Sequence, residues 1–377
     1  MKRLLCLCGV IAVCLSLYAT SAGAQILYSG GEDIDFQCAG SGACVVIPSA
    51  AYRAGWARSA YGVAGTVNDP PINRFSTSTF TASSTIWIHG QFCEVYDSFT
   101  GWDACGQNIT GVPTTANAQM IRVFDSAGNP SIVVSGTGSG GQLVVASRSS
   151  SGVFTTLTTC SSAITSALSQ VDLAINYGAS GSVTLYNNGA QVCSYSGNVT
   201  NGDGATTLDR VGFASPTTAA QVSSAWSEII VAGSDTRAMA RFTANTLGNG
   251  TTTGFTGTNI CSSIWNASSY NDANFGYTSA NDTIQECTIN STLPAGSYSV
   301  LGVVMSARAL VGSTGPQHFD FVTQIGGTEY TSPDMAPLNA FSNLTNYIQA
   351  VNPATSNPWS ISDIQATGFN LGEESKP

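Results

Sequence analysis

The chain has 377 residues, of which 43% are hydrophobic and only 9% charged, and its formal net charge is −10 at pH 7. Such an acidic chain lacks the basic patch through which proteins bind nucleic acid, and it is equally unsuited to an anionic membrane surface. Its length exceeds that of a usual single domain, so two domains are expected.

The N-terminus has the features of an export signal. A basic pair, KR, precedes an apolar run over residues 4–17, and the small-residue triplet AGA follows at residues 22–24. We predict a signal peptide over residues 1–24 and a soluble mature chain that begins at Gln25, either extracellular or periplasmic. A membrane anchor is the weaker alternative, because about fourteen apolar residues are too few to span a bilayer.

The cysteines support export. Of the 11 cysteines in the sequence, eight lie outside the predicted signal peptide, and an even number in an exported chain is typical of disulfides. Eight cysteines allow about a hundred connectivities, so the sequence does not choose one. Pairing in chain order is the simplest arrangement. A zinc site is disfavoured, because no CxxC pair occurs and only two histidines are present. The candidate disulfide cysteines are Cys38, Cys44, Cys93, Cys105, Cys160, Cys193, Cys261 and Cys287.

Short strand-like segments separated by turn residues follow one another from residue 26 to residue 232. Two of them, 85–92 and 171–177, alternate between apolar and other residues, which is typical of strands with one buried face. The Asn188-Gly189 dipeptide between two further segments predicts a two-residue type I′ hairpin, which needs positive φ at both central positions. This spacing predicts an antiparallel sandwich rather than an α/β fold. The expected inward set is Ile86, Ile88, Phe92, Val171, Leu173, Ile175 and Tyr177, and the expected outward set is Trp87, His89 and Gln91.

The stretch VDLAINYGASGSVTLYNNGAQV at 171–192, with VGFA at 211–214 and WSEIIV at 226–231, resembles concanavalin A-like (laminin-G-like) jelly-roll domains. The resemblance covers residues 26–235. It implies a jelly-roll sandwich over residues 25–233, in a family that includes glycan-binding lectins, adhesive modules and glucanases.

A long loop over residues 94–110, which contains Cys105 and directly follows Cys93, holds the predicted ligand-binding residues. Aromatic side chains of this loop can stack on a sugar ring, while its carboxylates and amide hydrogen-bond the hydroxyls. The same acidic loop also suits Ca²⁺, the one cofactor considered. The alternative is structural, with Trp102 covering the end of the sandwich and Asp103 serving a turn. The predicted ligand-binding residues are Tyr96, Asp97, Trp102, Asp103 and Asn108.

Catalysis is not expected. The glucanase branch of the resembled family carries a Glu-x-Asp-x-x-Glu cluster, and no such cluster occurs in this sequence. Glycoside hydrolysis needs two facing carboxyl groups, and a serine triad would be expected on a G-x-S-x-G elbow, which is also missing. His89 beside Trp87 is interpreted as a half-buried strand residue.

The segment 234–377 predicts a second β-sandwich. Strands are expected over 297–309, 343–351 and 361–372, and a hairpin over 317–332 with Gly326-Gly327 at its bend. The stretches 234–239, 306–317 and 352–359 resemble the C-terminal module of tailed-phage virion and phage-derived surface proteins. The signal peptide departs from that resemblance, because virion proteins assemble in the cytoplasm.

The sequence therefore predicts an all-β chain of two tandem antiparallel β-sandwiches, the first a concanavalin A-like jelly roll. The expected function is secreted, non-catalytic binding of a glycan or a cell-surface partner, without nucleic acid or membrane insertion. A phage-derived virion or appendage protein is the alternative, and a glycoside hydrolase is third.

Overall fold

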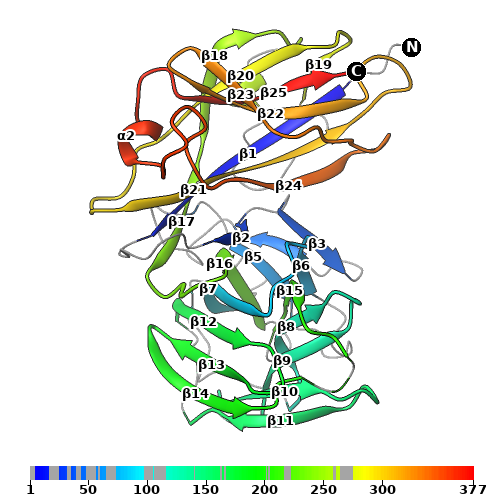
Figure 1. Ribbon diagram of the computed structural model, residues 1–377, viewed down its shortest axis with the longest axis vertical. Helices are drawn as coiled ribbons and strands as arrows, with labels where there is room; N and C mark the ends of the chain where they lie inside the picture. Colours follow the sequence, from blue (N-terminus) through cyan, green and yellow to red (C-terminus); the bar gives the residue numbers. More distant parts are fainter. Residues whose placement is uncertain are drawn as a thin grey trace. The chain divides into compact units, whose positions relative to one another are not determined.

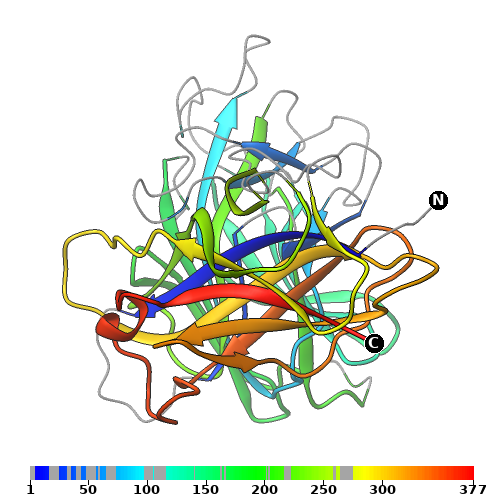
Figure 2. The same cartoon turned by 90° about the horizontal axis from the view of Figure 1, so that it is seen from above.

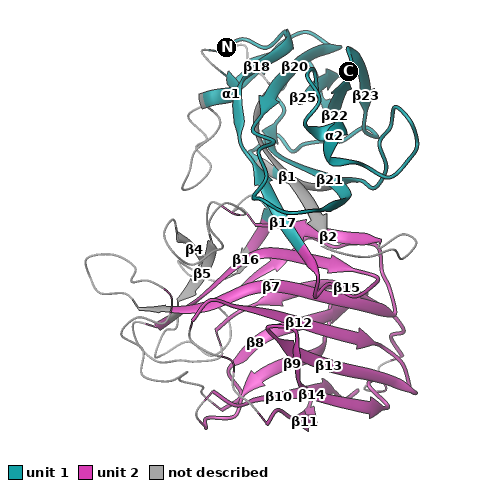
Figure 3. Cartoon of the chain, turned by 90° about the vertical axis from the view of Figure 1, so that its left-hand side faces the viewer, with its two compact units in different colours: residues 1–23, 32–35, 240–377 teal, residues 24–31, 36–239 magenta. Residues whose placement is uncertain are grey.

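The computed structural model describes residues 5–16, 25–31, 35–39, 44–47, 57, 60–64, 74–96, 105, 116–139, 141–161, 164, 167–200, 202, 204–215, 222–257, 260–263 and 275–377. These residues are mostly β-strand, as predicted, and form two compact units, which Figure 3 shows in different colours. Unit 2 spans residues 24–31 and 36–239, and unit 1 spans residues 1–23, 32–35 and 240–377. Among the described residues, no helix is both long and apolar enough to cross a bilayer.

Unit 2 consists of antiparallel sheets with the strand orders β14-β13-β12-β7-β16-β5-β4 and β11-β10-β9-β8-β15-β6-β3, and β2 also pairs with β16 (Figure 1). The alternating segments of the sequence form the centre of the first sheet, where β7 lies between β12 and β16. The strands are β2 (Ile26–Gly30), β3 (Phe36–Ala39), β4 (Cys44–Ile47), β5 (Ala60–Ala64), β6 (Arg74–Thr77), β7 (Thr85–Tyr96), β8 (Gln119–Asp125), β9 (Pro130–Gly136), β10 (Leu143–Arg148), β11 (Phe154–Thr159), β12 (Ser169–Asn176), β13 (Gly181–Asn187), β14 (Ala190–Gly197), β15 (Leu208–Phe213) and β16 (Val222–Ala232).

The core of unit 2 contains a run of aromatic rings. Trp226 is fully buried, with ring centroids 5.0 Å from Phe92 and 4.9 Å from Phe213. Phe213 in turn stacks on Phe75 at 5.3 Å. Gly90 makes room for this packing, because a Cβ atom there would lie 2.8 Å from Ile229 and 3.0 Å from the Trp226 ring. All the predicted inward residues of 85–92 and 171–177 are buried.

The predicted hairpin at Asn188-Gly189 is confirmed. Both residues have positive φ, +50° and +77°, and they join β13 to β14. The disulfide Cys160–Cys193 links the residue after β11 to β14, which are end strands of the two sheets. The pairs 93–105, 160–193 and 261–287 are all present as predicted. The side chains of Cys38 and Cys44 lie outside the described residues.

Unit 1 also has antiparallel sheets, with the orders β17-β1-β21-β24, in which β19 pairs with β1, and β18-β20-β25-β22-β23. The predicted hairpin at Gly326-Gly327 joins β22 to β23, and both glycines have positive φ. The strands are β1 (Leu5–Ser16), β17 (Met239–Ala244), β18 (Thr246–Thr253), β19 (Gly276–Thr278), β20 (Thr283–Ile289), β21 (Ser299–Leu310), β22 (His318–Ile325), β23 (Thr328–Thr331), β24 (Ser342–Gln349) and β25 (Asn370–Lys376), and a short helix α1 (Ile260–Ser263) follows β18.

The apolar N-terminal segment is a strand in this structure. Leu5–Ser16 forms β1, which runs antiparallel to β21 from Cys6 opposite Leu310 to Ser16 opposite Ser299. Figures 1 and 2 show β1 in dark blue within unit 1. Cleavage of residues 1–24 as a signal peptide therefore stays a prediction. Part of that segment, residues 5–16, forms a strand of unit 1 in this structure.

One predicted strand is wrong at its start. Residues 361–372 were expected to be extended, but Ile361–Ile364 form the short helix α2, and β25 begins only at Asn370. The reason is a capping box: the Ser360 side chain accepts a hydrogen bond from the Asp363 backbone, and the Asp363 side chain accepts one from Ser360.

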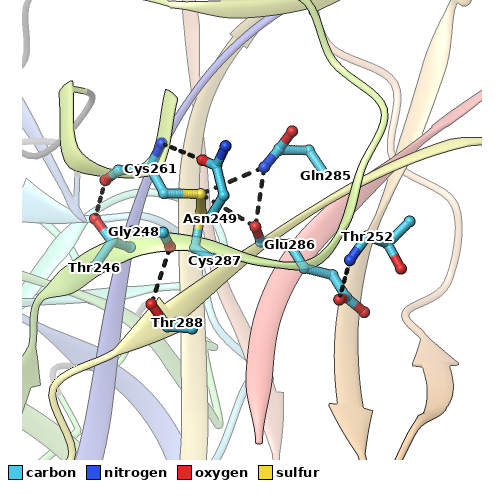
Figure 4. Close-up of a disulfide and its surroundings, with 9 residues drawn as sticks. All are labelled: Thr246, Gly248, Asn249, Thr252, Cys261, Gln285, Glu286, Cys287 and Thr288. Carbon is cyan, nitrogen blue, oxygen red and sulfur yellow. Dashed lines mark hydrogen bonds between the residues drawn. A yellow bond between two sulfur atoms is a disulfide. The ribbon is translucent and has the colours of Figure 1, made fainter. Parts of the chain in front are cut away.

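Two long-range contacts stabilise unit 1. The disulfide Cys261–Cys287 holds α1 against β20, and Gln285 and Glu286 surround it (Figure 4). The buried guanidinium of Arg241 on β17 lies 3.2 Å from the buried carboxylate of Asp35, 206 residues earlier in the chain.

Candidate functional site

The outward face of the first sheet of unit 2 contains most of the unusual chemistry. Because side chains alternate along a strand, β7 directs Trp87, His89, Gln91 and Cys93 to the face opposite the aromatic core. Neighbouring strands extend this row: Asp172 of β12 lies opposite His89. All of these side chains therefore share one surface of the sheet.

His89 is hydrogen-bonded to Asp172 and fully buried. Its Nδ1 atom lies 2.9 Å from an Asp172 carboxylate oxygen, and both side chains are 0% exposed. The half-buried position predicted for His89 is thus wrong, because the residues that follow β16 cross this part of the sheet. The Nε2 atom of His89 has no hydrogen-bond partner among the described residues.

Asp172 ties the chain segment after β16 to the sheet. The buried Thr236 hydroxyl donates to Asp172 Oδ1 at 2.8 Å, and the Gln170 side chain donates to Asp172 Oδ2 at 2.7 Å. Gln170 also donates to the carbonyl oxygen of Arg237 at 2.7 Å. A histidine and carboxylate of this geometry can move a proton in an open site. Here, complete burial favours a role in fixing the joint of residues 234–239.

An aromatic and charged patch lies beside this network, on the same face. The Trp87 and Tyr186 rings are 5.7 Å apart at an interplanar angle of 16°. The guanidinium of Arg237 lies 4.5 Å from the centre of the Tyr186 ring and 5.6 Å from that of Trp87, which is the geometry of a cation–π contact. Both rings are half-buried. We call Trp87, Tyr186, Arg237 and Asp235 the outer-face patch.

The polar half of the outer-face patch is an exposed ion pair. Arg237 donates to both carboxylate oxygens of Asp235, at 3.0 Å from Nε and 2.6 Å from Nη2, and the two side chains are 38% and 47% exposed. Burial alone would raise the pKa of Asp235, but the hydrogen bonds and charge of Arg237 outweigh it, and that pKa is lowered. The pair therefore stays ionised and presents donors and acceptors to solvent.

Glu94 is an unusual group on the inward side of β7. Its side chain is fully buried, and neither carboxylate oxygen has a hydrogen-bond partner in the described part of the chain. Desolvation raises its pKa from 4.5 to about 8. At neutral pH Glu94 is therefore mostly a neutral carboxylic acid.

The predicted ligand-binding residues lie mostly beyond what the structure describes. The backbone of Tyr96 ends β7, but its side chain, and Asp97, Trp102, Asp103 and Asn108, lie outside the described residues. The disulfide Cys93–Cys105 starts from the outward side of β7, so it holds Cys105 on the same face as Trp87. Within the described ranges, no group of three or more His, Cys, Asp or Glu side chains is placed to hold a metal ion.

Sequence reasoning missed Asp172, Tyr186, Asp235, Thr236 and Arg237 as neighbours of β7. The alternation of 171–177 places Asp172 on the outward face, and this was the available signal. Its pairing with His89, 83 residues away, depends on strand order, which the sequence does not state.

Comparison with known proteins gives only weak similarities to solved structures. No protein-family model and no curated protein matches the chain. Among solved structures, it is similar to endo-β-1,4-glucuronan lyase from the fungus Trichoderma reesei, with a TM-score of 0.38 and 11% identity over 58% of this chain and 98% of that one. It is also similar to the cellulose-induced protein Cip1, with a TM-score of 0.37 and 13% identity over 53% and 90%. A further similar structure is alginate lyase Aly36B, with a TM-score of 0.29 and 10% identity over 50% of this chain and 96% of that one. At these values the matches carry no conclusion about what this chain does.

Proposed function

We propose that this chain is an exported, non-catalytic protein that binds a glycan at the outer-face patch. The observation that carries the proposal is the contact of Arg237 with the paired rings of Trp87 and Tyr186, next to the exposed carboxylate of Asp235. Binding sites combine apolar aromatic surface with a few placed polar groups. Aromatic rings contact the C–H face of a sugar, and the ion pair hydrogen-bonds its hydroxyls.

The charge distribution favours a neutral glycan. Asp235 already neutralises Arg237, and the chain as a whole carries a formal charge of −10. A sulfated or carboxylated glycan would therefore approach against a repulsive field, whereas a neutral hydroxyl-rich ligand would not.

The loop after β7 is proposed as a second contact region. Tyr96 and Trp102 would add stacking surface, and Asp97, Asp103 and Asn108 would add hydrogen bonds or Ca²⁺ ligands. The disulfide Cys93–Cys105 supports this proposal, because it holds Cys105, within the predicted loop, beside Cys93 on the outward side of β7. The same disulfides favour an oxidising compartment, in agreement with the predicted export signal.

A glycan array followed by titration calorimetry tests the proposal with the exported wild-type protein and its variants. Trp87→Ala and Arg237→Ala should each weaken binding of any array hit by about tenfold or more, since each removes one side of the patch. Tyr330→Ala, a half-buried aromatic substitution in unit 1, is the matched control and should bind like wild type.

The variants separate the competing explanations. Weakening by Trp102→Ala, with no effect of Trp87→Ala, would assign the ligand to the loop instead of the patch. An array without any hit would count against glycan binding and favour the phage-derived structural alternative. Release of reducing or unsaturated sugar from a polysaccharide would overturn the non-catalytic assignment.

A further inference from the structure

The strand β1 occupies a position in its sheet that would become vacant if the predicted signal peptide were cleaved during export. Its residues, LCLCGVIAVCLS, belong to the segment predicted to be removed after residue 24. In the structure this strand lies inside a sheet, with β17 on one side and β21 on the other, and its first residues also pair with β19.

Removal of β1 would expose a long strand edge. β21 pairs with β1 along its whole length, from Ser299 to Leu310, and its central residues Val303, Val304 and Met305 are at most 1% exposed. Backbone N–H and C=O groups along this edge would lose their partners. Such a long apolar edge is a template for pairing with another strand.

If β1 were removed, β17 could not simply shift into the vacated position beside β21. Thr246, just after β17, donates to the carbonyl oxygen of Cys261, which the disulfide to Cys287 holds in place. Within β17, Arg241 is paired with Asp35. Direct pairing of β17 with β21 would need a movement of about 4.8 Å, one strand spacing, against these contacts.

We propose that the processed, exported chain accepts at this position an extended strand from another polypeptide, antiparallel to β21. The partner strand should resemble β1 in composition, with about twelve uncharged residues that are rich in small and β-branched apolar side chains. This mode of recognition is strand addition, in which main-chain hydrogen bonds supply the affinity and alternate side chains supply the specificity. It goes beyond glycan binding and gives unit 1 a role in assembly.

The first measurement concerns the exported protein itself. The full chain is expressed in a secreting host, and the exported product is analysed by N-terminal sequencing and intact mass. We expect it to begin at Gln25. A product that retains residues 5–16 would overturn the proposal, because the strand position would then be filled from within.

The second measurement probes the position with a synthetic peptide of residues 5–16 carrying Cys6→Ser, Cys8→Ser and Cys14→Ser. β24 still pairs with the other edge of β21, so only the amides of 299–310 that face the vacated position lose their partners. In the exported monomer these amides should exchange with solvent faster than those of 371–375 in β25. One equivalent of peptide should slow their exchange by about 100-fold or more, because they regain partners. A peptide of the same composition in scrambled order is the control.

The remaining outcomes are also decisive. If the amides of 299–310 that face the vacated position are already protected in a monomer that does not bind the peptide, the sheet closes by itself and the proposal is wrong. If they are protected in an oligomer that the peptide dissociates, a strand of another copy fills the position and the partner chemistry proposed above is wrong. Glycan binding by Trp87 and Arg237 is measured separately, so failure of one proposal leaves the other intact.

Discussion

The neutral, buried Glu94 makes the stability of unit 2 depend on pH in a defined direction. The pKa of Glu94 is raised from 4.5 to about 8 in the folded protein. Between these values the unfolded chain loses its proton while the folded chain keeps it. The contribution of Glu94 to the free energy of unfolding is therefore fully present below the unfolded pKa and is lost as the pH rises towards about 8. The loss is about 1.4 kcal/mol per pH unit and up to about 5 kcal/mol in all.

Glu94→Gln tests this reasoning, because glutamine resembles the neutral acid in shape and does not titrate. The variant should match wild type at about pH 4.5 and become the more stable protein as the pH rises, with a difference of up to about 5 kcal/mol at about pH 8. Glu329→Gln, at an exposed position in unit 1, is the control and should leave the pH profile of unit 2 unchanged.

Pulse proteolysis after equilibration in urea measures the free energy of unfolding, and peptides from β12 report on unit 2 alone. Measurements at several pH values from about 4.5 to about 8 give the slope for each protein. A wild-type slope equal to that of Glu94→Gln, or a difference that shrinks as the pH rises, would refute the assignment of Glu94 as a neutral buried acid.

Further predictions concern the packing of unit 2, measured by the same urea titration. Cys160→Ser together with Cys193→Ser should lower the free energy of unfolding by about 3–4 kcal/mol, since the bridge closes a loop of 33 residues. Gly90→Ala should cost about 1–3 kcal/mol, because the new methyl group would lie 2.8 Å from the Ile229 side chain. Thr236→Val should cost about 1–3 kcal/mol through loss of its buried hydrogen bond to a carboxylate. An unchanged midpoint in any of these variants would contradict the packing described for that residue.

Features set by neighbouring residues were predictable from the sequence. The Asn188-Gly189 hairpin follows from a local conformational requirement, and the inward residues of β7 and β12 follow from strict alternation. Disulfides paired in chain order are also confirmed for 93–105, 160–193 and 261–287. In each case the physical cause lies within one segment or between successive cysteines.

Features that depend on strand order were not predictable. Asp172 and His89 meet only because β12 lies beside β7, and Arg237 reaches Trp87 only because the joint crosses this part of the sheet. The place of β1 is the clearest example, since its apolar composition is equally typical of a signal peptide and of a strand inside a sheet. Composition alone does not distinguish those two.

The pairing of Asp35 with Arg241 has a consequence for biosynthesis. The ribosome synthesises Asp35 early, but Arg241 emerges only after the whole of unit 2. The ion pair between them can therefore form only late in translation. A fragment that begins at residue 240 would carry Arg241 into a closed interior without a counter-ion, which is strongly destabilising. Anyone dividing this gene into separately expressed pieces would therefore have to keep residues 32–35 with the C-terminal piece, although they are encoded at the other end.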